Sequence, residues 1–300
     1  MNRKTLLLIA AAIAVGAVLA IAQNDMSNVQ IKSTQLAEHV YMLEGTGGNM
    51  AVLTGPQGTL LVDDEFAALS EKIEAAIASA GGGKVRFLLN THWHGDHTGG
   101  NENFAKAGVA IFAQDNVRKR MSVAHNNELF GWKSEASPAA ALPVVTFDDS
   151  LTFHIDGETV TCFHAQRAHT DGDVMVWFRN ANVLHMGDCL FNPAYPVLDV
   201  STGGSIGGMI DASNRVLAMV ANDTKIIPGH GPLATRADVQ AFRDMLVTVR
   251  DRVKRLIVQK KTSDQVVAAK PLTDLDEKWG KGFVKADLFV KVVYADLAQK

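Results

Sequence analysis

Three histidines and an aspartate lie within six residues of one another, in the segment 91–100 (THWHGDHTGG). Imidazole nitrogens and carboxylate oxygens are the ligands that suit zinc and other first-row metals. Side chains of an extended chain alternate between two faces, so His92 and His94 point the same way and can share one metal ion. Asp96 and His97 follow where glycines permit a turn, and they can face a second metal ion. The alternative is a polar loop whose histidines occur by chance and bind no metal ion.

A two-metal site needs more ligands than this segment supplies, and the chain offers them at the ends of predicted strands. His169 stands just before one strand, and Asp188 stands just after another. His230 follows a third strand and lies in a Gly/Pro turn. A lone histidine in a loop is usually only solvated, so each of the three is weak evidence alone. Together with the segment 91–100 they predict a metal centre.

Strands and helices must position these residues. The predicted strands are 40–43, 50–54, 59–62, 85–90, 109–112, 151–155, 158–165, 174–178, 183–186 and 225–227. The predicted helices are 65–80, 101–106, 115–121, 205–221, 237–260 and one or two more from residue 264, ending in 288–297. Groups of strands and helices occur twice, before and after residues 122–143. This order suits two sheets packed together with helices outside.

Residues 122–143 interrupt that rhythm. They carry His125, Phe130 and Trp132, followed by alanines and prolines without a clear period. An irregular excursion of this kind is often a lid or a substrate wall. The alternative is an ordinary surface helix with one buried aromatic face.

Residues 1–22 have the pattern of a secretory signal peptide. Arg3 and Lys4 precede a nearly continuous apolar run, and residues 20–22 form a small-x-small cleavage site. An uncleaved membrane anchor is the alternative, but the apolar run is short for a span. We expect cleavage, a mature chain that starts near Gln23, and a periplasmic location.

Composition narrows the function classes. Loss of Arg3 and Lys4 changes the formal net charge from −3 to −5, and no basic run remains that would favour nucleic acid. We expect a small-molecule substrate and no membrane contact after cleavage, and the sequence carries no signal for an oligomeric state. With 47% hydrophobic residues, the chain can bury a large core. The two cysteines, Cys162 and Cys189, exclude a disulfide scaffold, and we expect no bridge between them.

The order His-x-His-x-Asp-His, a loop histidine, Gly-Asp and Pro-Gly-His resembles the metallo-β-lactamase superfamily. The resemblance extends to about residue 250. It implies an αββα four-layer sandwich with the metals at one edge between the sheets. We therefore predict one domain over residues 23–300, with a helical C-terminal extension.

The resemblance also assigns the ligands of two zinc ions. One site would be formed by His92, His94 and His169. The other would be formed by Asp96, His97 and His230, and Asp188 would bridge both.

This seven-ligand set looks like the pattern of glyoxalase II-like thioesterases and lactonases, whereas the best-known β-lactamases of the superfamily lack the bridging aspartate. Some of those β-lactamases have a cysteine or serine near the position of the bridging aspartate and a lysine shortly after it. Here Cys189 follows Asp188 and no lysine comes next. Cys189 either joins the site or packs in the core, and we favour the core. Related lactonases have a tyrosine where this chain has Phe191.

The resemblance implies a zinc-dependent hydrolase in which a hydroxide between the two metals attacks an acyl carbon. Asp96 would orient the nucleophile, and Asp188 would hold both metals. We predict β-lactamase-like opening of a cyclic amide or ester, because an exported enzyme meets incoming compounds. Hydrolysis of an acyl-homoserine lactone or of a thioester is the alternative, and a non-catalytic metal-binding module is a third.

Other polar residues have open roles at this stage. Asn192 is either an oxyanion donor or a turn residue before Pro193, and Tyr195 is a second candidate donor. His185 either orients a metal ligand or packs within its strand.

Overall fold

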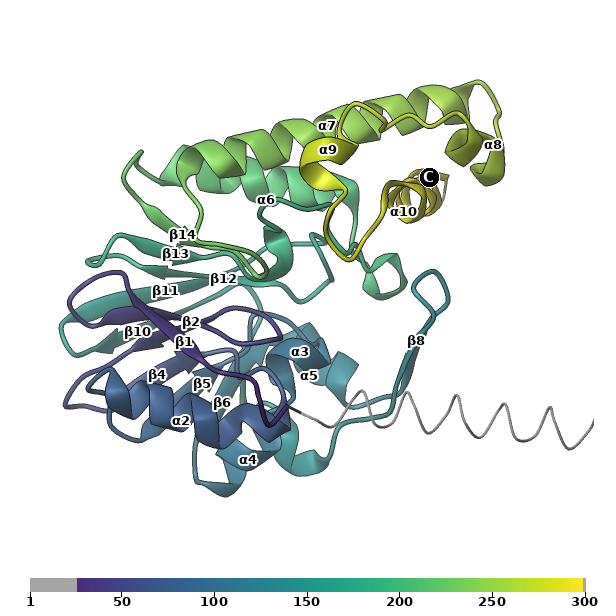
Figure 1. The fold of residues 1–300 in the computed structure, drawn as a ribbon. Coiled ribbons are helices and arrows are strands. Elements are labelled where there is room, and N and C mark those ends of the chain that lie inside the picture. Colours follow the sequence, from purple (N-terminus) through teal and green to yellow (C-terminus); the bar gives the residue numbers. More distant parts are fainter. Residues whose placement is uncertain (1–25, 299–300) are drawn as a thin grey trace, which may run out of the picture.

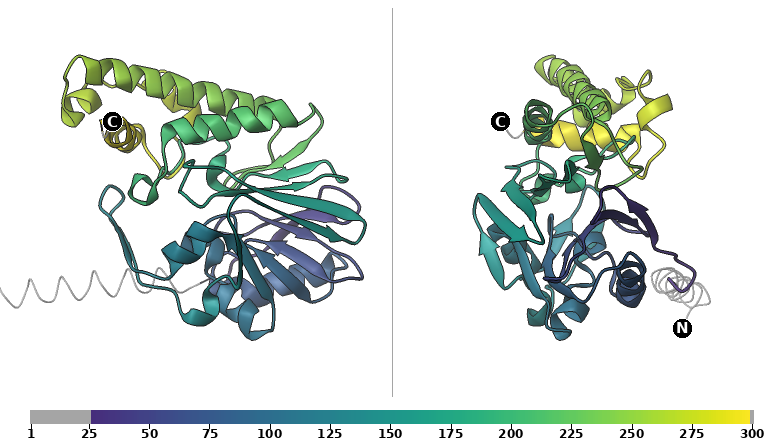
Figure 2. Two further views of the ribbon diagram at one scale, coloured as in Figure 1. Left: turned by 180° about the vertical axis from the view of Figure 1, so that it is seen from behind. Right: turned by 90° about the vertical axis from the view of Figure 1, so that its left-hand side faces the viewer.

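The computed structural model describes residues 26–298, and Figures 1 and 2 show them as two facing sheets with helices on the outside. The arrangement is an αββα sandwich, as the sequence predicts. The predicted signal segment 1–22 lies outside the described residues.

The first sheet has seven strands within the described residues, in the order β1-β2-β3-β4-β5-β6-β9. Their bounds are β1 Lys32–Gln35, β2 Val40–Glu44, β3 Met50–Leu53, β4 Thr59–Val62, β5 Val85–Leu89, β6 Ala110–Gln114 and β9 Val145–Phe147. Strands β1 to β4 pair antiparallel, whereas β4, β5, β6 and β9 pair parallel. The carboxyl ends of β4 and β5 therefore share one edge.

The second sheet has five strands in the described part of the chain, in the order β10-β11-β12-β13-β14. Their bounds are β10 Ser150–Ile155, β11 Glu158–His164, β12 Val174–Phe178, β13 Val183–His185 and β14 Lys225–Ile227. Pairing is antiparallel up to β13, and β13 pairs with β14 in parallel. The carboxyl ends of β13 and β14 consequently lie together.

The helices follow the chain in two groups. Those of the first half are α2 Ser70–Ser79, α3 Gly95–Thr98, α4 Asn101–Lys106 and α5 Asp115–Met121. Those of the second half are α6 Ile206–Met219, α7 Arg236–Val258, α8 Ser263–Ala268, α9 Asp276–Trp279 and α10 Ala286–Ala298. Short 3-10 turns lie at Ala67–Leu69, Ala139–Ala141, Gly187–Cys189 and Val200–Thr202.

The three largest apolar layers of the described residues hold the sandwich together. The central layer joins the two sheets and contains side chains such as Leu60 and Val176. A second layer packs α2 and α4 against the outer face of the first sheet, through residues such as Ile73. The third and largest layer packs α6, α7 and α10 against the second sheet, through residues such as Phe242 and Phe289. Burial of apolar area on this scale is the main source of stability.

Two predicted elements differ in the structure. The helix predicted to begin at Glu65 begins at Ser70, because Glu65 has a positive φ of 50° and cannot start a helix. Residues 122–143 contain an antiparallel hairpin, β7 (His125–Asn127) and β8 (Trp132–Ser134), in place of a surface helix. The edge strands β1 and β9 have no clear pattern in the sequence that predicts them.

No helix within residues 26–298 has both the length and the apolar content needed to cross a membrane. Cys162 and Cys189 are both free and buried, as expected.

Candidate metal centre

The loops after three strands, β5, β13 and β14, converge at one edge of the sandwich. His92 follows β5, and the short helix α3 carries Asp96 and His97. Asp188 follows β13, and His230 follows β14. Ligand sites in α/β sheets commonly form outside the carboxyl ends of strands, because loops from neighbouring strands meet there.

The seven predicted ligands fall into two groups within the described residues. In each group the potential ligand atoms lie within 4.8 Å of one another. The first group consists of His92, His94, His169 and Asp188, and the second consists of Asp96, His97 and His230. The structure thus brings together all seven residues.

Asp188 lies between the two groups and turns one carboxylate oxygen towards each. Its Oδ2 is 3.8 Å from Nε2 of His92 and 3.4 Å from Nε2 of His169. Its Oδ1 is 3.1 Å from Nε2 of His97 and 3.4 Å from Nε2 of His230. Two ligand atoms of a tetrahedral zinc ion lie about 3.3 Å apart. The separations around Asp188 therefore suit two ions that share this carboxylate.

The second nitrogen of each of two imidazoles donates a hydrogen bond away from the centre. Nδ1 of His97 donates to Oδ2 of Asp63 at 2.8 Å. Nδ1 of His169 donates to the carbonyl oxygen of Val197 at 2.8 Å. Because the outer nitrogen carries the proton, the inner Nε2 presents a lone pair to the centre.

His92 and His94 are fixed in the same way. Nε2 of His94 donates to Oδ2 of Asp199 at 3.2 Å, which leaves its Nδ1 facing inward. The Thr91 hydroxyl donates to Asp63 at 2.7 Å, so it accepts from Nδ1 of His92 at 3.1 Å. Four imidazoles thus point lone pairs into one small volume.

This arrangement fits a bound cation. Nδ1 of His94 and Nε2 of His169 are only 2.8 Å apart, although the outer nitrogen of each ring already carries the proton. Two facing lone pairs repel unless a positive charge lies against both. Nε2 of His92 is buried and has no hydrogen-bond partner among the described residues. A buried polar atom without a partner is costly, and coordination to a metal ion would satisfy it.

Charge also favours a cation. Burial raises the pKa of Asp188, but the nearby His230 and His97 outweigh it and hold that pKa well below its usual range. The Asp96 carboxyl likewise has a lowered pKa, because His97 and His230 offset the effect of its burial. In the other direction, burial lowers the pKa of His230, and the carboxylates of Asp188 and Asp96 raise it to about 9. Two ionised carboxylates therefore lie within reach of metal ions.

Two glycines allow loops to approach the ligands closely. A Cβ at Gly48 would overlap the imidazole of His97, and a Cβ at Gly229 would overlap Oδ1 of Asp188. The two loops are also joined, because the Asn49 N–H donates to the Gly229 carbonyl at 2.7 Å. His185 braces the same region: its Nε2 donates to the Asn49 carbonyl at 2.9 Å, and its Nδ1 accepts from the N–H of Gly187. His185 therefore positions the loops around Asp188.

Sequence reasoning missed Asp63 and Asp199, which orient the ligands. Asp63 is fully buried and has a positive φ of 61°, a conformation that is uncommon outside glycine and that clusters at functional sites. Its signal was an acidic residue at the end of a buried strand. Asp199 is 105 residues from His94 in the sequence, and no local motif indicates that the two residues are in contact.

Two other residues do not serve as direct ligands or donors, and a third supports a turn. The Cys189 thiol packs in the core, and burial raises its pKa well above the usual value, so it stays neutral. The suggestion that Tyr195 donates to an oxyanion is wrong, because its buried hydroxyl donates to Oδ1 of Asp276 at 3.0 Å. The Asn192 amide donates to the Pro232 carbonyl at 3.1 Å and thereby supports the His230 turn.

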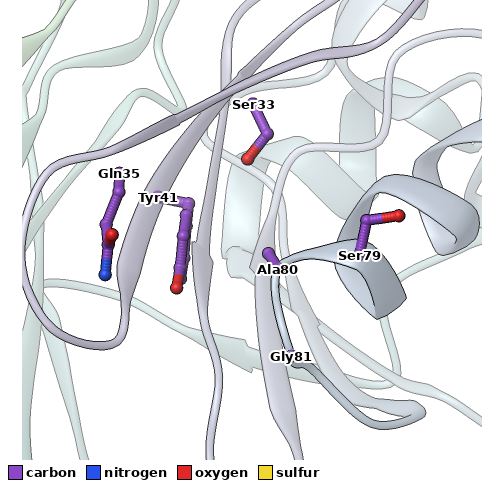
Figure 3. Close-up of a pocket in the computed structure, with 6 residues that line it drawn as sticks. All are labelled: Ser33, Gln35, Tyr41, Ser79, Ala80 and Gly81. Carbon is purple, nitrogen blue, oxygen red and sulfur yellow. The ribbon is translucent and has the colours of Figure 1, made fainter.

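A pocket elsewhere on the surface lacks this chemistry. Figure 3 shows Ser33, Gln35 and Tyr41 facing the end of α2 at Ser79 and Ala80, with no imidazole or carboxylate among the residues that line it.

Comparisons with known proteins identify the family of the chain. The family model described as "Metallo-beta-lactamase superfamily" matches residues 43–230. A protein named "Metallo-beta-lactamase type 2" from Bacteroides fragilis is 27% identical over 221 residues, which cover 67% of this chain and 79% of that protein. A "Hydroxyacylglutathione hydrolase" from Rhodospirillum rubrum is 30% identical over 168 residues, or 54% of each chain.

Solved structures share the fold. A metallo-beta-lactamase from Pontibacter korlensis has a TM-score of 0.60 at 18% identity, covering 72% of this chain and 99% of that one. The stereoselective inverting sec-alkylsulfatase Pisa1 from Pseudomonas sp. has a TM-score of 0.64 at 17% identity. That match covers 88% of this chain and only 50% of the sulfatase.

Proposed function

The chain belongs to the metallo-beta-lactamase superfamily, and we propose that it is a two-zinc hydrolase that opens a cyclic amide or ester, with a β-lactam as the leading substrate. One observation carries the two-metal part of this proposal: Asp188 divides its two oxygens between two groups of imidazoles. A single ion would need only one of those groups.

Each group of residues would have a defined task. Bound zinc would lower the pKa of a water molecule and polarise the scissile carbonyl. His92, His94 and His169 would hold one ion, and Asp188 would keep the two ions at a fixed spacing. The half-buried Asp96 carboxylate, 3.3 Å from Nε2 of His230, would accept a hydrogen bond from the attacking water. Asp96 and Asp188 are therefore the proposed catalytic residues.

The β-lactam assignment rests on relatives. The match to the Bacteroides fragilis protein covers most of that chain, and a second protein of the same name, from Bacillus cereus, is 24% identical over 212 residues.

A lactone or thioester is the second candidate. The position of Asp188 favours it, because a bridging aspartate is the feature that the sequence shares with thioesterase- and lactonase-type hydrolases. The relative named hydroxyacylglutathione hydrolase supports the same alternative. A non-catalytic metal-binding module has the least support, since it would not need every ligand to be present.

A panel of substrates tests the proposal and ranks the candidates. We expect the purified protein to hydrolyse nitrocefin, to lose the activity in EDTA and to regain it with zinc. Activity on acyl-homoserine lactones or hydroxyacylglutathione without activity on any β-lactam would reverse the ranking. Asp188→Asn should lose most of this activity. The matched control, Asp274→Asn, changes an exposed carboxylate paired with Arg252 and should keep the activity. If the protein binds zinc but hydrolyses none of these substrates, the result would favour the non-catalytic metal-binding module.

We also propose that the enzyme acts in the periplasm, on the pattern of residues 1–22. Mass spectrometry of the protein from the periplasmic fraction of a bacterial host should give a chain that starts near Gln23. A full-length chain in the membrane fraction would contradict this.

A further inference from the structure

The hairpin β7–β8 carries a stack of aromatic rings, of which Phe130 packs against the edge of the largest apolar layer. Figure 1 shows β8 rising from the side of the sandwich towards the C-terminal helices, and Figure 2 shows the hairpin from behind. Phe130 stacks on Trp132 with ring centroids 4.6 Å apart and an interplanar angle of 24°. Trp132 is nevertheless 37% exposed.

A segment far along the chain completes the stack. Phe283, between α9 and α10, lies 5.9 Å from Trp132 with an interplanar angle of 28°, and it is 69% exposed. The segment is held in place, because the Tyr195 N–H donates to the Trp279 carbonyl at 2.8 Å. We call Phe130, Trp132 and Phe283 the aromatic wall. Contiguous exposed aromatic surface of this kind commonly marks a binding site.

The aromatic wall begins next to the metal centre. The Trp132 ring is 6.1 Å from the ring of His94, at an angle of 81°. Trp93 lies against the same imidazole at 4.6 Å, so two tryptophans flank this predicted ligand. A group attached to a carbonyl at the metal centre would therefore reach Trp132 within a few bonds.

The hairpin is fixed relative to the metal centre by a shared carboxylate. The Asn127 amide of β7 donates to Oδ1 of Asp199 at 2.8 Å, and Oδ2 of Asp199 accepts from His94. The nearby Arg120 is already paired with Asp171, at 2.6 and 3.2 Å, so it does not offer a free charge to a substrate. The hairpin is thus held beside His94 through Asp199.

We propose that the aromatic wall binds an extended apolar acyl group of the substrate, which makes Trp132 and Phe283 specificity-determining residues. The inference rests on the proposed hydrolase for the position of the reacting carbonyl, but the binding of the apolar group can be measured without turnover.

The test uses straight-chain carboxylates, from butanoate to decanoate, as probes that join an apolar chain to a carboxylate, and calorimetry measures their binding to the zinc-loaded protein. We expect Kd to fall about threefold for each added methylene up to about eight carbons, because each one is removed from water. Trp132→Ala and Phe283→Ala should each weaken decanoate binding by about tenfold, equivalent to losing contact with two methylenes. Butanoate, which is too short to cover the wall, should change by less than about twofold.

Val258→Ala is the matched control, because Val258 is an exposed apolar side chain at the end of α7. It should leave the dependence on chain length unchanged, and circular dichroism should show that all three variants fold. A Kd that does not depend on chain length, or a dependence that survives both wall substitutions, would overturn the inference. Hydrolysis of nitrocefin without a fall of Kd with increasing chain length would overturn this inference alone. The trend without hydrolysis of any substrate would overturn the proposed function alone.

Discussion

Asp63→Asn should selectively weaken zinc binding, although Asp63 touches no metal ion. Oδ2 of Asp63 accepts from Nδ1 of His97 at 2.8 Å and from the Thr91 hydroxyl at 2.7 Å, and its Oδ1 accepts from the Thr91 N–H at 2.7 Å. An asparagine has only one acceptor oxygen. In either orientation of the amide, its NH2 group would face a donor in a fully buried position.

The size of the effect follows from that mismatch. Leaving one buried donor without an acceptor costs about 1–3 kcal/mol, which corresponds to about 5-fold to 150-fold in affinity. Substitutions of residues that orient metal ligands generally weaken metal binding by about 10–100-fold. His97 contacts Asp63 directly, whereas His92 is connected to it only through Thr91. The ion held by Asp96, His97 and His230 should therefore be weakened more than the ion held by the first group.

Zinc titration against a competing chelator measures both affinities. The matched control is Asp64→Asn, because Asp64 is the neighbouring buried carboxyl and burial raises its pKa well above the usual value. Its Oδ1 accepts from the Gly100 N–H, and an asparagine oxygen can do the same. Two affinities in Asp63→Asn equal to those of the parent protein would refute the role assigned to Asp63.

Three further predictions concern the same centre. Asp188→Asn offers a single ligand oxygen where two are needed, so kcat/KM for the best substrate of the panel should fall by about 10³-fold. A kcat/KM within tenfold of that of the parent protein would contradict a shared carboxylate. Gly48→Ala would place a Cβ in the His97 imidazole. It should therefore lower the free energy of unfolding, measured in urea, by about 1–3 kcal/mol and release zinc from the second group. Unchanged stability and zinc content would show that the loop can move away from His97. In the metal-free protein burial lowers the pKa of His230, and the carboxylates of Asp188 and Asp96 raise it to about 9, so a proton competes with zinc below that pH. Zinc affinity should therefore rise with pH up to about 9, by up to about tenfold per pH unit. A flat profile from pH 6 to 9 would contradict the assignment of His230 as a ligand.

The ligand positions were predictable because their signals are local. The alternation of His92 and His94 along an extended chain, and the glycines around Asp96, already indicate side chains that face a common point. The αββα arrangement follows from the family resemblance, and the order of strands and helices alone supports two packed sheets.

The orienting residues and the hairpin were not predictable, because their contacts are made between distant segments. Asp199 reaches His94 only after the chain has formed both sheets, and no spacing in the sequence pairs them. The stack of Trp132 and Phe283 joins residues that are separated by most of the second sheet and its helices. The start of α2 was placed too early because the positive φ of Glu65 depends on its buried carboxylate, which accepts from the N–H groups of Thr46 and Gly47.

In the proposed centre, two ions share Asp188. X-ray absorption spectroscopy of the zinc-loaded protein, together with metal analysis, tests it most directly. We predict two zinc ions per chain and a metal–metal vector of about 3.5–4 Å. One zinc ion per chain, or two ions without a metal–metal vector, would contradict it.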